Sequence, residues 1–370
     1  MAERGAPVSW QARIRRAGAG IMLALLAAGC SAPQQTTVAA PPGTSTVAGT
    51  SVHAVQTHAA GSGTPAAQPA LGHTARPAHA PTDRAGVHTA GGNPPGTNPV
   101  QSQFRPRLGV YAKGVPHSYR PIEQFSAAVG KQPGIVLFYS GFGEHFPVGF
   151  AQQAHAHGAV PLDQIQPTGI SIAQIAAGRY DAYLKSYADE VRDYQHRVII
   201  GFAHEMNGSW YPWGWTHVSQ GTWVRAWRRV VTDFRSQHAN NVTWLWTISR
   251  VLNQGPVRSF WPGASYVNWV GIDGYYSEAQ DTFSNVFVRI MKVVHQFTHD
   301  PILISESAIG QRAGQARKIP NLLAGVVQYH LRGLVWFDVA QHGGLSKQDW
   351  RLEGHPSALA AFRQADRGFA

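Results

Sequence analysis

The chain has 370 residues, a formal net charge of +11 and a single cysteine. Its basic residues form no cluster interleaved with aromatic residues, which argues against a nucleic-acid partner. One cysteine excludes an intramolecular disulfide and a cysteine metal site. With 44% hydrophobic residues, the chain is long enough to bury a sizeable core.

The N-terminus resembles an export signal. Basic residues at 13–16 (RIRR) precede a short apolar run at 17–28 (AGAGIMLALLAA), which is too short to span a membrane. The small residues before Cys30 make the ending AAGC similar to a bacterial lipoprotein signal, in which the cysteine is lipidated. We therefore expect a signal peptide over 1–29, lipidation at Cys30 and export to the cell envelope or the extracellular medium. An ordinary cleaved signal is the alternative.

Residues 30–103 are rich in Ala, Pro, Gly and Thr and nearly devoid of aromatic residues. Such a segment cannot bury enough apolar surface to offset its ordering entropy, so we expect a disordered linker between the lipid anchor and a folded domain. A solvated linker also fits its widely spaced histidines better than metal binding does; these are His53, His58, His73, His79 and His88.

From residue 104 onwards, short apolar runs alternate with helix-like segments. Several of the runs are continuously apolar, as expected for parallel strands covered by helices. Eight such strands predict one (β/α)₈ TIM-barrel domain over 104–370, of the α/β class. A doubly wound open sheet is the alternative, but no glycine-rich phosphate loop follows the first strand. The predicted strands lie within 108–112, 135–142, 159–167, 197–207, 242–249, 267–276, 301–307 and 331–339, and helices are predicted at 179–195, 222–237, 283–298 and 314–330.

Polar and aromatic residues follow several of these strands, where the catalytic groups of such barrels lie. Two carboxylates directly follow apolar runs: Glu205 after the fourth strand and Glu306 after PILIS of the seventh. A pair of carboxylates on either side of a glycosidic bond is sufficient for glycoside hydrolysis. A single glutamate would fit a buried ion pair at the barrel rim, but two with Trp and Tyr around them favour catalysis.

Four segments carry a resemblance to glycoside hydrolase family 26, whose best-known members are β-mannanases. HEMNGSWYPWG at 204–214 resembles the fourth-strand motif of that family, and ILISESAIG at 302–310 resembles its nucleophile segment. WVGIDGYY at 269–276 and LVWFDV at 334–339 resemble its sixth and eighth strands. The resemblance spans roughly residues 105–365. It implies a retaining enzyme, with carboxyl groups about 5–5.5 Å apart.

The resemblance also implies roles for individual residues. Glu205 would be the acid/base and Glu306 the nucleophile. His204 would bind the sugar at the cleavage point, Asn207 would hold the fourth-strand loop, and Trp210 would be a stacking platform.

Three further residues take roles from the same resemblance. Tyr275 would form a hydrogen bond near the nucleophile and hold its orientation, with Asp273 behind it. Trp336 would form the floor of the site.

The sequence departs from the better-known mannanases near the expected substrate subsites. Gly201 stands where an Arg is frequent, Gln166 precedes Pro167 where a Trp is common, and the fifth strand ends in TISR rather than Pro-Asn. These departures leave the sugar open. β-1,4-Mannan is the leading substrate, and mixed-linkage β-glucan, β-1,3-xylan or an envelope glycan are the alternatives.

The sequence lacks the motifs that other hydrolytic chemistries require. HEMNG is not HExxH, no G-x-S-x-G elbow occurs, and the lone cysteine lies in the leader. No cofactor motif appears, so we expect hydrolysis without metal or cofactor, by a monomer that contacts the membrane only through its lipid anchor. A non-catalytic carbohydrate-binding lipoprotein and a structural envelope lipoprotein remain as alternatives from other classes.

Overall fold

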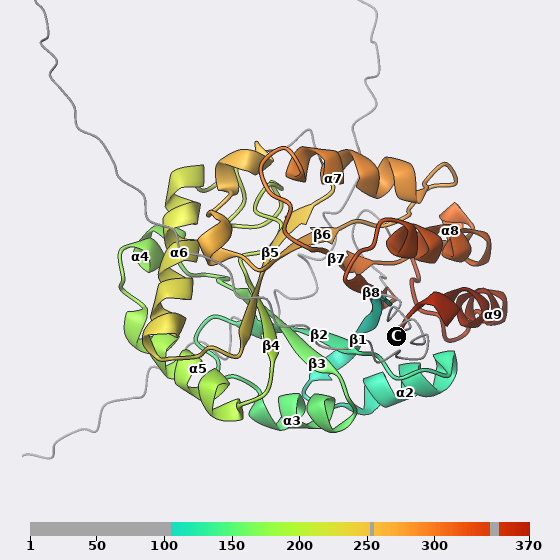
Figure 1. Ribbon diagram of the computed structural model, residues 1–370, viewed down its shortest axis with the longest axis horizontal. Coiled ribbons are helices and arrows are strands. Elements are labelled where there is room, and N and C mark those ends of the chain that lie inside the picture. The colour runs from blue at the N-terminus through green and yellow to red at the C-terminus, as the bar shows by residue number, and fades with distance from the viewer. Residues whose placement is uncertain (1–104, 252–254, 341–347) are drawn as a thin grey trace, which may run out of the picture. The chain divides into compact units, whose positions relative to one another are not determined.

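A computed structural model of the protein describes residues 105–251, 255–340 and 348–370. Within these residues, eight parallel strands close into a barrel in chain order, with helices around the outside (Figure 1). The predicted (β/α)₈ barrel is thereby confirmed. The predicted leader, Cys30 and the linker to residue 103 lie outside the described residues. The strands are β1 (Arg107–Pro116), β2 (Ile135–Gly141), β3 (Val160–Gln166), β4 (Val198–Phe202), β5 (Val242–Ser249), β6 (Trp269–Asp273), β7 (Ile302–Ser307) and β8 (Gly333–Asp338).

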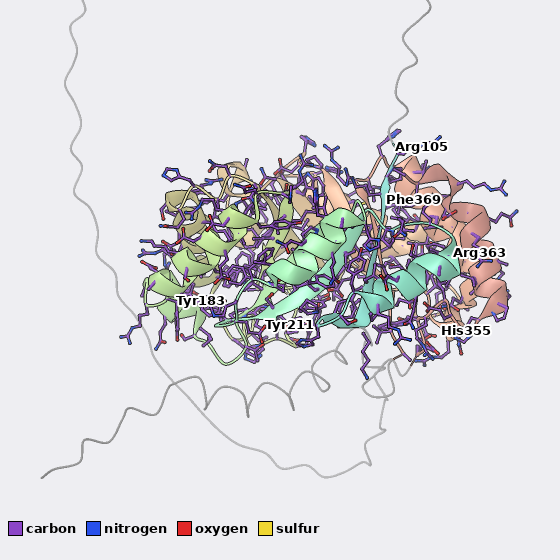
Figure 2. All side chains as sticks on the ribbon, turned by 90° about the horizontal axis from the view of Figure 1, so that it is seen from below. Arg105, Tyr183, Tyr211, His355, Arg363 and Phe369 are labelled. Atoms are coloured by element: carbon purple, nitrogen blue, oxygen red, sulfur yellow. The ribbon has the colours of Figure 1, made fainter. Side chains whose placement is uncertain are left out.

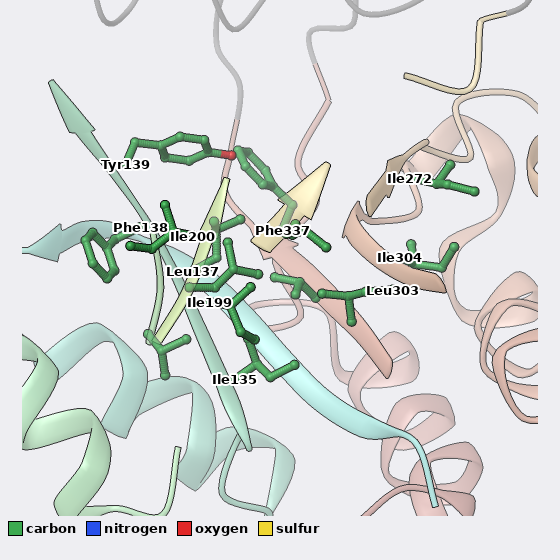
Figure 3. Packing of buried hydrophobic residues seen from close by; sticks show 14 of the residues in the cluster. Ile135, Leu137, Phe138, Tyr139, Ile199, Ile200, Ile272, Leu303, Ile304 and Phe337 are labelled. Atoms are coloured by element: carbon green, nitrogen blue, oxygen red, sulfur yellow. The ribbon is translucent and has the colours of Figure 1, made fainter. Parts of the chain in front are cut away.

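The strands form where the sequence is continuously apolar. Every residue of β4 (VIIGF) is buried, and so is every residue of β7 and β8. Burial on both faces is what a parallel strand between a filled barrel and a helix layer requires. Figure 3 shows the packed side chains of this core, from Ile135 near the start of β2 to Tyr139 near its end.

The helices cover the barrel with their apolar faces. Helix α6 begins at the cap residue Ser219, whose hydroxyl accepts from the Thr222 N–H, and it buries Trp223 and Trp227. The predicted segment at 283–298 starts as a π-helical turn (Ser284–Val288) before it becomes α7. The α-helices are α2 (Arg120–Val129), α3 (Val148–Ala156), α4 (Ile172–Ala176), α5 (Asp181–Tyr194), α6 (Gln220–Ser236), α7 (Arg289–Val294), α8 (Gln315–Gln328) and α9 (Pro356–Ala365).

Strand β7 contains a bulge next to a predicted catalytic residue. Ile272 of β6 pairs with Ile304, but the next residue, Asp273, pairs with Glu306, so Ser305 is an extra residue on β7. The register with β8 shifts at the same place. A bulge re-aims the side chains around it. Here it allows both Ser305 and Glu306 to reach polar partners, as described below.

The carboxyl ends of the strands form one edge of the barrel. Figure 2 shows Tyr211 and His355, which follow β4 and β8, at the opposite edge from Arg105, which precedes β1. In the part of the chain that the structure describes, no helix combines the length and apolar character needed to cross a membrane.

Candidate active site

The segment after β4 has an unusual backbone that places Glu205 at the barrel mouth. Ala203 and Glu205 both have positive φ values, 48° and 53°, which L-residues rarely adopt. The Glu205 N–H donates to the Thr247 carbonyl of β5 at 2.9 Å, so the turn is tied to the neighbouring strand. Backbone strain of this kind clusters at functional sites, where the surrounding structure maintains it. Glu205 is partly exposed, whereas its neighbour His204 is buried.

Asn207 ties the same segment to the end of β5. Its Nδ2 donates to the carbonyls of Ser249 and Val251 at 2.9 and 3.2 Å, and its Oδ1 accepts from the Ser249 N–H at 2.9 Å. Asn207 is fully buried, and its two hydrogen bonds with Ser249 are shielded from water. The amide therefore acts as a clamp between the end of β5 and the loop that carries Glu205.

Aromatic side chains enclose His204 and Glu205. Trp210 is partly exposed and donates its indole N–H to Glu205 Oε2 at 2.7 Å, so it contacts the carboxylate directly. Trp213 donates to the His204 carbonyl at 2.7 Å and stacks on Tyr211 at 4.5 Å. The Tyr211 hydroxyl lies 3.1 Å from His204 Nε2. The motif is thus a rigid loop in which these aromatic residues pack against the two polar residues.

Glu306 is held by two tyrosines. The Tyr275 hydroxyl donates to Oε2 at 2.7 Å, and the Tyr139 hydroxyl of β2 donates to Oε1. Glu306 is only 5% exposed. Both oxygens of a buried carboxylate therefore have a hydroxyl donor, which favours the ionised form.

Asp273, the last residue of β6, is buried and close enough for its charge to raise the pKa of Tyr275. Its Oδ1 accepts from the Ser305 hydroxyl at 2.6 Å, and its Oδ2 is buried without a hydrogen-bond partner. Burial and the nearby charge of Glu306 raise the pKa of Asp273 well above its usual range. Ionisation of Asp273 is therefore disfavoured.

The two glutamates also have raised pKa values. Burial, followed by the charge of Glu306, raises the pKa of Glu205 to about 8, against the lowering effect of hydrogen bonds from Trp210 and Ser249. Burial raises the pKa of Glu306 to about 7, and the hydrogen bonds from its two tyrosines oppose that rise. Burial also lowers the pKa of His204 to about 3, so this imidazole is neutral. At neutral pH, Glu205 retains its proton more readily than Glu306 does.

Trp336 is not in the site, so the prediction that it forms the floor is wrong. It is fully buried and packs edge-on against Phe362 of α9, in the layer between barrel and helices. Neighbouring residues of a strand face opposite sides, so Trp336 points outward while Phe337 points to the mouth and stacks on Tyr111 at 4.6 Å. Trp350, and not Trp336, lies beside Tyr275, on which it stacks at 4.4 Å.

Sequence reasoning assigned no role to Tyr139 or Trp350. Tyr139 was visible as a polar aromatic residue at the end of the second predicted strand, which is a usable signal. No such signal marks Trp350 in the sequence. It lies twelve residues after the end of β8, and the antiparallel bridge between Ala340 and Asp349 places it at the site.

No group of three or more His, Cys, Asp and Glu side chains suited to a metal ion occurs in residues 105–251, 255–340 and 348–370. A surface hollow beside α2 and α3, lined in part by His117, Tyr119 and His157, includes none of the residues above. The mouth holds two carboxyl groups in different environments, Glu205 partly exposed and Glu306 buried, with neutral donors and aromatic rings around them. Such a pair can donate a proton from one group and attack with the other.

Comparisons with known proteins agree with this chemistry. The sequence profile of Glycosyl hydrolase family 26 matches residues 132–311. Endoglucanase H of Acetivibrio thermocellus is 27% identical over 277 residues, which cover 70% of this chain and 30% of that protein. The mannan endo-1,4-beta-mannosidase of Bacillus subtilis strain 168 is 28% identical over 141 residues, which cover 35% of this chain and 37% of that protein. The chain thus spans about a third of the length of these two relatives.

Solved structures share the fold. A GH26 beta-mannanase from Bacteroides ovatus superposes with a TM-score of 0.56 at 16% sequence identity, covering 72% of this chain and 89% of that one. At this identity, the likeness supports the barrel architecture and not a substrate.

Proposed function

Because the chain belongs to glycosyl hydrolase family 26, we propose that it hydrolyses internal β-glycosidic bonds of a polysaccharide, with β-1,4-mannan as the leading substrate. The observation that carries this proposal is the pairing of Glu205 and Glu306 at one barrel mouth. The first is partly exposed with the higher pKa, and the second is buried with a hydroxyl donor on each oxygen. These are the environments that a general acid and a nucleophile require.

The proposed reaction is a double displacement. Glu306 attacks the anomeric carbon while Glu205 gives its proton to the departing glycosidic oxygen, which leaves a covalent glycosyl–enzyme. Glu205, now ionised, takes a proton from water as that water attacks the same carbon and releases Glu306. The sugar keeps its β configuration, and both carboxyl groups return to their starting protonation states.

The remaining site residues orient the substrate. His204 is neutral and buried beside Glu205, so it can form hydrogen bonds with a sugar hydroxyl without adding charge. Trp210 offers a partly exposed ring next to the acid. We assign the floor of the site to Trp350, whose position on Tyr275 puts it beside Glu306.

A substrate screen tests the proposal. The purified protein is incubated with glucomannan, galactomannan, mixed-linkage β-glucan and β-1,3-xylan, and new reducing ends are counted, with Glu306→Ala as the blank. Release from a mannan that is lost in the blank is the expected result. Equal release by wild type and blank, or none from any polymer, would contradict it.

β-Glucan is the second candidate substrate. It is favoured by the widest of the matches described above, to a protein named an endoglucanase, and by Gly201 standing where the better-known mannanases have Arg. Release from mixed-linkage β-glucan but not from mannans in the same screen would select it.

We also propose that the protein is exported and lipidated at Cys30, on the strength of the sequence pattern alone. Incorporation of radiolabelled palmitate in the host cell, and its loss in Cys30→Ser, is the expected result. Equal labelling of both forms would contradict lipidation at this residue.

A further inference from the structure

Tyr139 lies on β2, three strands around the barrel from Glu306 on β7, yet its hydroxyl donates to Glu306 Oε1. We propose that Tyr139 is a positioning residue which, together with Tyr275, holds Glu306 ionised and fixes the direction of its carboxylate in the way a cation would. This inference rests on the nucleophile role proposed for Glu306. It adds a residue to which neither the sequence motifs nor the family resemblance gave a role.

The charges around Glu306 explain why it needs two hydroxyl donors. Glu205 and Asp273 are acids, and Tyr111, Tyr211 and His204 carry no positive charge. Burial raises the pKa of Tyr111 to about 12, raises that of Tyr211 and lowers that of His204 to about 3. The pKa shifts of Glu205, Asp273 and Glu306 have other causes than the charge of Arg250, the residue that follows β5.

An ionised carboxylate that is 5% exposed is costly unless it has hydrogen-bond donors. Among the described residues, the side-chain donors to the two Glu306 oxygens are the Tyr139 and Tyr275 hydroxyls. Charge-assisted hydrogen bonds of this type are stronger than neutral ones. The two tyrosines therefore supply the stabilisation that a Lys or Arg would otherwise supply.

Two neighbouring rings pack against Tyr139. Tyr111 packs edge-on against it at 5.1 Å, and the His204 ring lies 5.6 Å away. Tyr111 itself stacks on Phe337, so this contact extends to β8. A hydroxyl on a ring held in this way keeps one position, as a pre-organised site requires. Tyr139 is thus suited to orient the carboxylate and not only to fill space.

The experiment compares three Tyr→Phe variants of the full protein. Tyr139→Phe removes the proposed donor, Tyr275→Phe removes its counterpart, and Tyr111→Phe is the matched control, because it is a neighbouring tyrosine with no hydrogen bond to Glu306 in the described structure. Carboxyl-carbon NMR of protein labelled with carbon-13 glutamate follows the titration of Glu306, whose signal is assigned with Glu306→Gln. This readout does not depend on turnover.

We expect Tyr139→Phe to raise the titration midpoint of Glu306 by about one to two pH units, as Tyr275→Phe does, because each loses a hydrogen bond to the charged form. Tyr111→Phe should leave the midpoint in place. On a glycan that the wild-type protein hydrolyses, Tyr139→Phe should also lower kcat about tenfold or more, with little change in KM. The acid limb of its pH profile should move to higher pH.

An unchanged Glu306 midpoint in Tyr139→Phe, alongside a raised one in Tyr275→Phe, would overturn the inference. If Tyr139→Phe does not fold, 3,5-difluorotyrosine at position 139 replaces it. Its more acidic hydroxyl should lower the midpoint, and an unchanged midpoint would again overturn the inference. Absence of hydrolysis by wild type would contradict the proposed function and leave this titration result to stand by itself.

Discussion

Trp336 donates its indole N–H to the backbone carbonyl of Trp350 at 3.0 Å. The two tryptophans have different surroundings, because Trp336 packs on Phe362 of α9 and Trp350 stacks on Tyr275. Asp338 adds to this connection by accepting from the Leu352 N–H at 2.9 Å. The end of β8 thus holds the returning segment that brings Trp350 to the site.

The two tryptophans should respond differently to truncation. Trp336→Ala removes a fully buried ring and should lower the free energy of unfolding by about 3–5 kcal/mol, with kcat/KM of the folded protein within about tenfold of wild type. Trp350→Ala should lower kcat/KM by more than about tenfold, because the aromatic surface beside Glu306 is lost. Chemical denaturation and steady-state kinetics measure the two effects. The reverse assignment would restore Trp336 as the floor of the site.

Glu205→Gln should lower kcat by about 10²–10⁴-fold, because an amide cannot donate the proton that the leaving oxygen needs. Substrate affinity should stay close to that of wild type, since amide and acid have nearly the same shape. Reducing-end release and calorimetry on an oligosaccharide measure the two quantities. Glu123→Gln, on the exposed face of α2, is the matched control and should change neither. Wild-type turnover in Glu205→Gln would show that another group is the acid.

The pH profile of kcat/KM should be a narrow bell near neutrality. Activity falls on the acid side as Glu306, with a pKa near 7, takes up a proton and can no longer attack. Activity falls on the alkaline side as Glu205, with a pKa near 8, loses the proton that it must donate. The midpoints of the two limbs are apparent pKa values of the carboxyl pair as a whole. Initial rates across the pH range measure them, and a profile flat from pH 5 to 10 would be incompatible with this pair.

Asn207→Asp should lower kcat more than it changes KM. The new carboxylate can still accept from the Ser249 N–H, but it cannot donate to the carbonyls of Ser249 and Val251, so the loop carrying Glu205 loosens. Asn241→Asp is the matched control, because Asn241 ties the carbonyls of Val191 and His196 together away from the site. We expect it to reduce stability without changing kcat. Equal kcat values for the two variants would contradict the role of Asn207 in holding the loop that carries Glu205.

Most of the barrel could be predicted from the sequence because its strands are continuously apolar. The prediction for β5, 242–249, coincides with the observed strand. Helices α2, α3, α4 and α9 were not predicted. Helix α3 (VGFAQQAHA) has a weak apolar stripe, and α4 is only five residues long, so neither produces a clear pattern.

The sequence indicated site residues where polar side chains lie near the end of a strand, as Glu306 does in β7, or soon after it, as Glu205 and Asn207 do after β4. The prediction for Trp336 was wrong because the sequence does not show which residues of β8 point into the barrel and which point outward. The register of β8 and the position of α9 decide this. The position of Trp350 depends on the bridge between Ala340 and Asp349, and the sequence between them carries no sign of it.

Asp163→Asn should change how stability depends on pH. Burial raises the pKa of Asp163 to about 7, against hydrogen bonds from Tyr187 and Ser140 that lower it. The folded state therefore holds a proton that the unfolded chain releases near pH 4, and this contribution to stability is lost as pH rises from about 4 to 7. The variant lacks that loss, so its Tm relative to wild type should increase over this interval. Thermal melts at several pH values, with Glu123→Gln as control, measure it; a constant difference would refute it.

Proton NMR of a β-mannan oligosaccharide during hydrolysis tests the central claim most directly, because it reports cleavage and stereochemistry together. We predict that the β-anomer of the new reducing end appears first and converts to the α-anomer only by mutarotation, and that Glu306→Ala shows no new signal. The α-anomer appearing first would contradict double displacement through Glu306. Cleavage that persists in Glu306→Ala would contradict the assignment of the nucleophile.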